Sequence, residues 1–76
     1  IGDMNGVSVA LSNLGELTYL AGDWRRAEQF FQRGLDMARR INDTWSILAS
    51  LNNLGMVCTA QGRLDTARQL LLEGLA

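Results

Sequence analysis

A phrase of five residues occurs twice in this chain, forty residues apart. Leu-Ser-Asn-Leu-Gly at residues 11–15 returns as Leu-Asn-Asn-Leu-Gly at residues 51–55. At the same offset, further pairs of identical residues follow: Gly22 and Gly62, Ala27 and Ala67, Gln29 and Gln69, Gly34 and Gly74. A recurrence at a fixed period predicts a repeat architecture, in which one supersecondary unit is copied along the chain. We therefore expect two equivalent units, residues 1–40 and 41–76.

Apolar residues recur at steps of three and four throughout both units, and the chain contains no Pro. This spacing predicts four amphipathic helices, and no stretch alternates with the period of two that is typical of a strand. We expect helices at about residues 4–21, 24–40, 44–61 and 64–76. The fold class is therefore all-α, with antiparallel helix pairs. The second unit is shorter than the first, so we expect a fragment of a longer array.

Residues suited to helix ends stand between the expected helices. Asp3, Asp23 and Asp43 can each accept hydrogen bonds from the free N–H groups of a first helical turn. Gly22 tolerates the left-handed conformation that often closes a helix. Arg63 takes the place of Asp23 in the second unit, so the last helix should be the least well capped.

Composition excludes several classes of function. The net charge is −1 and all basic residues are Arg, which argues against a nucleic-acid-binding protein, because such proteins need a basic surplus. The chain has no His, no clustered metal ligands and no phosphate-binding loop, so we expect no enzyme, no metal and no cofactor. No apolar run reaches the roughly 20 residues that span a bilayer. The single Cys58 favours a reducing compartment, and we expect a cytoplasmic location.

Glycine lies inside each of the four expected helices, although it costs about 1 kcal/mol relative to Ala there. Close approach of two helices would explain why glycine is present at these positions despite that cost. We expect Ala27 and Ala67 to face Gly15 and Gly55 within a pair, and the other two glycines to face the first helix of the following unit. Phe31 would be a large wedge beside these contacts. The residues expected to serve packing are Leu14, Gly15, Ala27, Phe31, Gly34, Leu54, Gly55, Ala67, Leu71 and Gly74.

These residues resemble the tetratricopeptide repeat, a helix–turn–helix unit. Residues 11–15 match its opening, with Leu11 where the family has Trp. The spacing from Ala27 to Phe31 matches its second half, and residues 67–71 repeat that spacing with Leu in place of Phe. The resemblance covers essentially the whole chain. It implies a right-handed α-α superhelix, or solenoid, of two units.

The chain also departs from the family pattern. Thr18 and Cys58 stand where the family usually has Tyr, the closing Pro is missing, and the period is 40 residues instead of about 34. Longer units of this kind are similar to those of kinesin light chains, of adaptors with Leu-Gly-Asn repeats, and of sensor regions in bacterial regulators.

The resemblance implies a binding site on the concave wall formed by the first helix of each unit. Asn13 and Asn53 immediately precede the Leu-Gly pair, where related proteins direct a side chain at a peptide backbone. An amide offers a donor and an acceptor, which suits a peptide unit. The residues expected to contact a protein or peptide ligand are Asn13, Asn53, Ser12, Asn52, Glu16, Met56, Tyr19, Val9 and Ala49. Alternatively, the two Asn side chains bridge adjacent repeats and have a purely structural role.

Two further features have structural interpretations. Trp24 and Trp45 stand near helix starts, where packing is the more common role than docking a ligand. The pairs 25–26 and 39–40, both Arg-Arg, are expected to be solvated or to interact with helix dipoles. The functional hypothesis is a protein-interaction module of a larger scaffold or signalling protein. The alternative is a structural spacer or self-association module, a possible homo-oligomer through exposed terminal helix faces. A nucleic-acid module is a remote third hypothesis.

Overall fold

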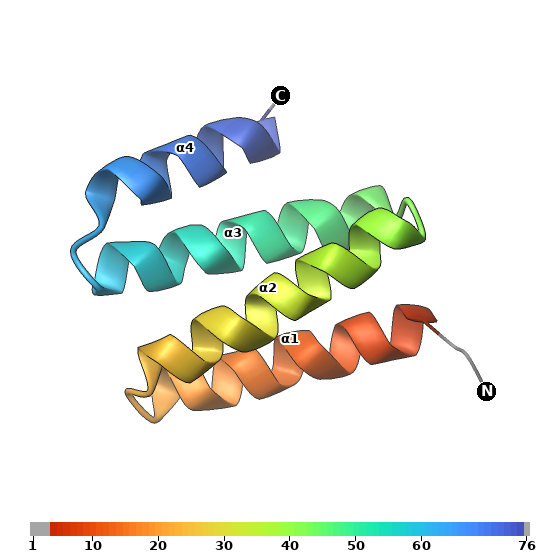
Figure 1. Cartoon of the computed structure of the whole chain (residues 1–76), viewed down its shortest axis with the longest axis horizontal. Helices are drawn as coiled ribbons and strands as arrows, with labels where there is room; N and C mark the ends of the chain where they lie inside the picture. The colour runs from red at the N-terminus through yellow and green to blue at the C-terminus, as the bar shows by residue number, and fades with distance from the viewer. Residues whose placement is uncertain (1–3, 76) are drawn as a thin grey trace.

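The computed structural model describes residues 4–75, and they form four helices (Figure 1). These are α1 (Met4–Leu20), α2 (Trp24–Arg40), α3 (Thr44–Ala60) and α4 (Leu64–Leu75). No strand occurs within these described residues, so the all-α prediction is confirmed. The expected cap Asp3 lies outside them.

The three turns between the helices are built alike. Each contains one residue with a positive φ: Gly22 at 84°, Asn42 at 55° and Gly62 at 76°. In the first turn, the N–H of Gly22 donates to the Tyr19 carbonyl at 3.0 Å, and the N–H of Asp23 donates to the Thr18 carbonyl at 2.9 Å. The other two turns repeat both hydrogen bonds. This pair of bonds satisfies the free carbonyls at a helix end and reverses the chain within three residues.

The residue that ends each turn stands immediately before the next helix, at the N-cap position. The Asp23 carboxylate accepts from the N–H of Arg26 at 3.2 Å, and the Asp43 carboxylate accepts from the N–H of Ser46 at 3.4 Å. Arg63, at the third such position, has no acceptor in its side chain. Its guanidinium donates to Glu28 of α2 instead, at 2.9 Å.

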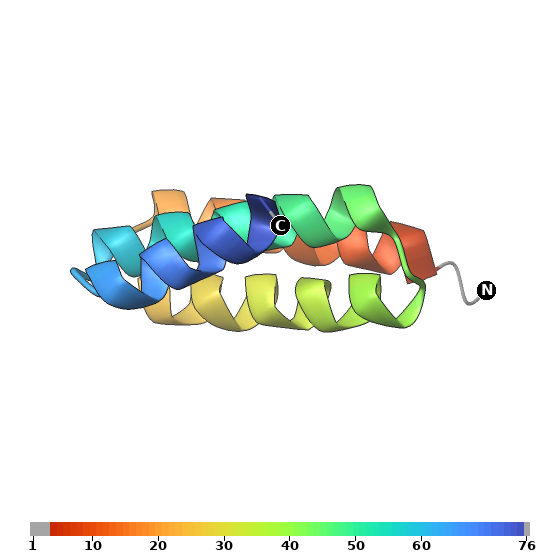
Figure 2. The ribbon, with the colours of Figure 1, turned by 90° about the horizontal axis from the view of Figure 1, so that it is seen from above.

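The helices form two layers because each turn places the next helix beside the previous one. α1 packs on α2, α2 on α3 and α3 on α4, while α1 also touches α3. Figure 2 shows α1 and α3 in one layer and α2 in the other. The two first helices of the units, α1 and α3, run in the same direction (Figure 1).

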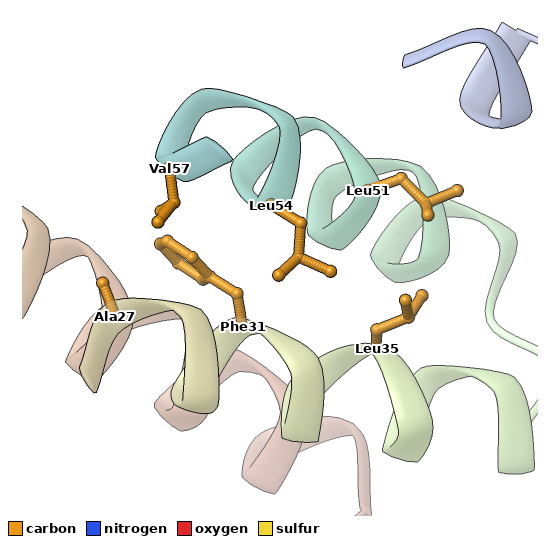
Figure 3. Packing of buried hydrophobic residues seen from close by; sticks show 6 residues of the cluster. All are labelled: Ala27, Phe31, Leu35, Leu51, Leu54 and Val57. Carbon is orange, nitrogen blue, oxygen red and sulfur yellow. The ribbon is translucent and has the colours of Figure 1, made fainter. Parts of the chain in front are cut away.

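The hydrophobic core lies at the junction between the two units, not inside either of them. Its buried cluster consists of three side chains of α2 and three of α3: Ala27, Phe31, Leu35, Leu51, Leu54 and Val57. Figure 3 shows the two sets facing each other across the gap between these helices. The second helix of the first unit therefore packs on α1 of its own unit and also buries apolar side chains against the first helix of the second unit.

The interior glycines permit close approach: the expected wedge Phe31 lies against Gly15, and Ala67 lies beside Gly55 as expected. A Cβ built on Gly15 would lie 2.6 Å from Cδ1 and 2.9 Å from Cζ of Phe31. The ring thus rests directly on the glycine, and the nearest atoms belong to Phe31 instead of Ala27. In the second unit, a Cβ on Gly55 would lie 3.0 Å from Cγ of Leu71 and 3.6 Å from the carbonyl oxygen of Ala67.

The prediction that Gly34 and Gly74 face the following unit is wrong. The atoms nearest to a Cβ built on Gly34 belong to Ser8, Leu11 and Ser12 of α1, all at 3.7 Å. Those nearest to a Cβ on Gly74 belong to α3, at 3.8 Å or more. Both glycines therefore face the first helix of their own unit. The reason is that α2 packs on both α1 and α3, and it directs Ala27, Phe31 and Leu35 toward α3 while Gly34 faces α1.

Equivalent residues of the two units are not equally buried. Leu54 lies in the core, whereas Leu14, expected to serve packing, is exposed. Leu71 is also partly exposed, whereas its counterpart Phe31 is fully buried. Leu54 is covered by the second helix of the unit before it, and the described residues contain no such helix beside Leu14. The position in the stack, and not the residue type, decides the burial.

Candidate functional site

The α1–α3 layer exposes one face that the second helices do not cover. Asn13 and Asn53 each stand two residues before a glycine that faces the second helix of its unit. Since each helical residue turns the chain by roughly 100°, the two Asn lie on the opposite side of α1 and α3. Asn13 is exposed and Asn53 is half-buried.

Residues one turn away on the same side of each helix complete this surface. Val9 and Glu16 flank Asn13 at intervals of four and three, and Ala49 and Met56 flank Asn53 in the same way. All four are exposed. We call this surface the amide face, defined by Val9, Asn13, Glu16, Ala49, Asn53 and Met56.

Neither Asn side chain on the amide face is held by a hydrogen bond within the described residues. Among residues 4–75, the side chains of Asn13 and Asn53 make no hydrogen bond to another residue. The interpretation that they bridge adjacent repeats therefore finds no hydrogen bond in its support. Both amides keep their donors and acceptors available for a ligand.

Three of the residues expected at the binding site lie elsewhere. The hydroxyl of Ser12 points toward Gly34 of α2, and Tyr19 packs against the hydrophobic core. Asn52 lines a hollow of about 330 Å³ between α3 and α4, together with Leu48, Leu70, Leu71 and Gly74. Ser12 and Asn52 differ from the adjacent Asn13 and Asn53 because one step along a helix turns a side chain away by more than a quarter turn.

Two large apolar side chains beside the amide face were missed by reasoning from sequence. Trp45 is 82% exposed and stands four residues before Ala49, and Leu20 is 80% exposed and stands four residues after Glu16. The expectation that Trp45 serves packing is wrong. The four-residue spacing to Ala49 was the signal that could have placed it beside the site. Trp24, on α2, is 39% exposed.

Charge plays little part in the amide face, because Glu16 is its only ionisable residue. The Arg residues instead form ion pairs at other surfaces. Arg26 lies 3.7 Å from the Asp23 carboxylate within α2 and its cap. Arg39 of α2 pairs with Glu73 of α4, and Arg63 pairs with Glu28 at 2.9 Å. The last two pairs link the two units, which the sequence did not reveal.

The thiol of Cys58 is buried beside the unit junction. Burial raises its pKa; the nearby Arg63 guanidinium lowers it and Glu28 raises it to lesser extents. A raised pKa keeps the thiol protonated near neutral pH, and a protonated thiol is a poor nucleophile. Within residues 4–75, no group of three His, Cys, Asp or Glu side chains is arranged to hold a metal ion.

The hydroxyl of Ser50 on α3 is buried and has no hydrogen-bond partner among residues 4–75. An unpaired buried hydroxyl costs free energy, and Ala is also the better helix former. We expect Ser50→Ala to raise the free energy of unfolding by about 1 kcal/mol, measured by urea denaturation. Ser8→Ala is the control, because the buried Ser8 hydroxyl donates to the Gly34 carbonyl at 3.4 Å. An equal gain in both variants would contradict this reason.

The tetratricopeptide repeat family model matches residues 6–76 of the chain. The chain therefore belongs to the tetratricopeptide repeat family, and its α1–α2 and α3–α4 pairs are the two units. Repeats of this family mediate protein–protein interaction and form a non-catalytic module. No match was found to a curated protein or to a solved structure. Among the described residues, no helix is both long enough and apolar enough to cross a membrane.

Proposed function

We propose that this chain is a protein-interaction module that binds an extended peptide segment across its amide face. The observation that carries the proposal is the pair Asn13 and Asn53, which occupy the same place on two parallel helices and have no hydrogen-bond partner among residues 4–75. The module would form part of a larger scaffold or signalling protein in the reducing cytoplasm.

The spacing of the two Asn suits an extended peptide. Packed helix axes lie about 10 Å apart, so equivalent side chains on α1 and α3 are separated by about that distance. An extended chain rises about 3.3 Å per residue. The two amides can therefore reach peptide units about three residues apart on a segment that crosses both helices. Backbone recognition of this kind is independent of the ligand's side chains.

The rest of the surface indicates what side chains the ligand carries. Val9, Ala49 and Met56 are apolar, and Trp45 adds a large exposed ring beside Ala49. With Glu16 as the single charge, the face favours an uncharged segment with some apolar side chains. A strongly acidic ligand has no Arg to meet on this face.

The proposal is tested with peptides selected from a random display library on the 76-residue chain. We expect Asn13→Ala and Asn53→Ala each to weaken the binding of the selected peptides by about three- to tenfold, which corresponds to the loss of one hydrogen bond. The matched control is the double variant Gln29→Ala and Gln69→Ala, which removes equivalent amides from the exposed surface of α2 and α4. Helicity is followed by circular dichroism. Unchanged affinity in folded Asn variants would remove the amide face from the proposal.

A second candidate function is that of a spacer or self-association module without a peptide ligand. The observation in its favour is the set of exposed apolar side chains at the two ends of the stack, which include Leu14, Leu17, Leu71 and Leu72. Apolar patches of this kind commonly mark contacts with another protein. The two functions are separable, because the Asn variants should leave self-association unchanged.

A further inference from the structure

The two ends of the stack carry the same kinds of side chains that meet at its centre. At the junction, Phe31 of α2 and Leu54 and Val57 of α3 are 0%, 2% and 0% exposed. Forty residues away, Leu71 on α4 is 42% exposed, and Leu14 and Leu17 on α1 are 44% and 65% exposed. The α4 end therefore presents a copy of the α2 side of the junction, and the α1 end presents a copy of the α3 side.

An ion pair at the junction has a counterpart at the ends with the signs exchanged. Glu28 of α2 accepts from Arg63, before α4, at 2.9 Å. The residues forty positions away are Arg68 on α4 and Asp23 before α2. Both are exposed, and Arg68 has no partner among residues 4–75. Opposite charge is thus preserved at the two positions although both residue types have changed.

We propose that the α4 end of one chain binds the α1 end of a second copy, in the geometry by which residues 41–76 pack on residues 1–40. Arg68 of the first chain then pairs with Asp23 of the second, and Leu14 and Leu17 of the second pack on α4 of the first. The charge exchange points to a second copy of this chain because a partner with Arg at position 23, as in the second unit, would repel Arg68.

The α4 end is hollowed where this contact would form. Leu70, Leu71 and Gly74 line the hollow of about 330 Å³. Their counterparts in the first unit are Phe30, Phe31 and Gly34, and of these Phe31 packs with Leu54 of α3 in the buried cluster. In Figure 3, Leu54 extends from α3 toward the space between Phe31 and Leu35. Leu14 of a second copy would occupy the hollow in the same way.

Polar groups at the α1 end are compatible with burial in this contact. Ala10 replaces Ser50, so the unpaired hydroxyl of the internal junction is not repeated. Thr18 replaces Cys58, and its hydroxyl donates to the Leu14 and Gly15 carbonyls of its own helix at 2.9 Å. At these two positions the contact therefore buries no hydroxyl without a partner.

The contact joins unlike ends, so it does not form a dimer in which the same surfaces of both chains meet. Each added chain leaves one free end of each kind, and association should continue into linear oligomers instead of stopping at a dimer. The amide faces of successive chains would then line up. This inference does not depend on peptide binding, and it is tested without a ligand.

Sedimentation velocity tests the proposal on the 76-residue chain from about 10 μM to about 1 mM, the range of weak complexes. We expect the mean mass to rise steadily with concentration. Arg68→Glu should raise the concentration needed for association about fivefold, since it places two acids together. Arg68→Glu combined with Asp23→Arg recreates the natural Glu28–Arg63 arrangement and should return that concentration to within about twofold of the starting chain.

Two further variants separate this contact from a general effect of net charge and from association through another surface. Arg25→Glu changes the net charge equally at an exposed site on α2, and it should leave association nearly unchanged. Leu14→Asp should abolish association while the helical signal persists, because Leu14 is exposed in the single chain. A monomer over the whole range would overturn the proposal. So would equal effects of Arg68→Glu and Arg25→Glu, absence of rescue in the double variant, or association that survives Leu14→Asp.

Discussion

Gly15→Ala is expected to lower the free energy of unfolding by about 2 kcal/mol, although Ala is the better helix former. The new methyl group would overlap the Phe31 ring, with Cδ1 only 2.6 Å away. The ring cannot move aside easily because Phe31 is fully buried between α1 and α3. The cost of overpacking therefore exceeds the gain of about 1 kcal/mol in helix propensity. Urea denaturation followed by circular dichroism measures the change.

Gly34→Ala is the matched control for this prediction. The nearest atoms to its new methyl group are 3.7 Å away, which is ordinary van der Waals contact. The same substitution should there raise the free energy of unfolding by up to about 1 kcal/mol.

A second control is Gly15→Ala in a Phe31→Leu background. This substitution should cost much less free energy. In the second unit, Leu71 lies over Gly55 as Phe31 lies over Gly15, and it would need only a small adjustment to accommodate a Cβ there. Destabilisation of equal size at Gly15 and Gly34 would contradict the role assigned to the Phe31 ring.

Phe31→Ala is expected to have the largest effect of any single substitution, a loss of about 3–5 kcal/mol. Phe31 is the largest fully buried side chain, and it contacts the core cluster and also covers Gly15. A chain of this size has a total free energy of unfolding of about 4–11 kcal/mol. The variant should therefore lose most of its stability, with a melting temperature lower by about 15–30 °C.

Leu71→Ala provides the comparison, because Leu71 is the equivalent residue of the second unit and is partly exposed. Its truncation removes fewer contacts, so we expect a loss near 1 kcal/mol. Thermal denaturation of both variants at low concentration avoids any contribution of association. Similar losses at the two positions would show that the end of the stack is covered.

Much of the fold could be predicted from the sequence because local signals were consistent. The apolar spacing and the absence of Pro indicated four helices, and the left-handed conformation expected at Gly22 is present. Asp23 and Asp43 cap α2 and α3 as expected. Each of these features depends on residues within one helical turn of one another.

Contacts between helices were less predictable. The period showed that Gly34 needs a close neighbour but did not show whether that neighbour belongs to the same unit or to the next one. The pairing of Arg63 with Glu28 joins residues 35 positions apart, and no local pattern indicates it. Leu14 and Leu54 occupy equivalent positions in the sequence, yet their burial differs because, among residues 4–75, only Leu54 is covered by the second helix of a preceding unit.

In the candidate site, too, local spacing could be predicted from the sequence, whereas contacts between helices could not. Asn13, Asn53 and the four residues around them share one face because helical spacing places them there. Ser12, Asn52 and Tyr19 are close to them in sequence but lie on other surfaces, because they are turned toward neighbouring helices. Trp45 was assigned to packing because of its residue type and its place near a helix start, and it is exposed because no helix among residues 4–75 covers it.

The location of the hydrophobic core has a consequence for how the chain divides into parts. All six side chains of the buried cluster belong to the helix pair α2–α3, which spans the boundary between the two copies of the sequence motif. The turn between them is constructed like the turns inside each copy. The buried cluster is thus shifted by one helix relative to the sequence repeat. Cutting the chain between the two copies would separate the two halves of this cluster.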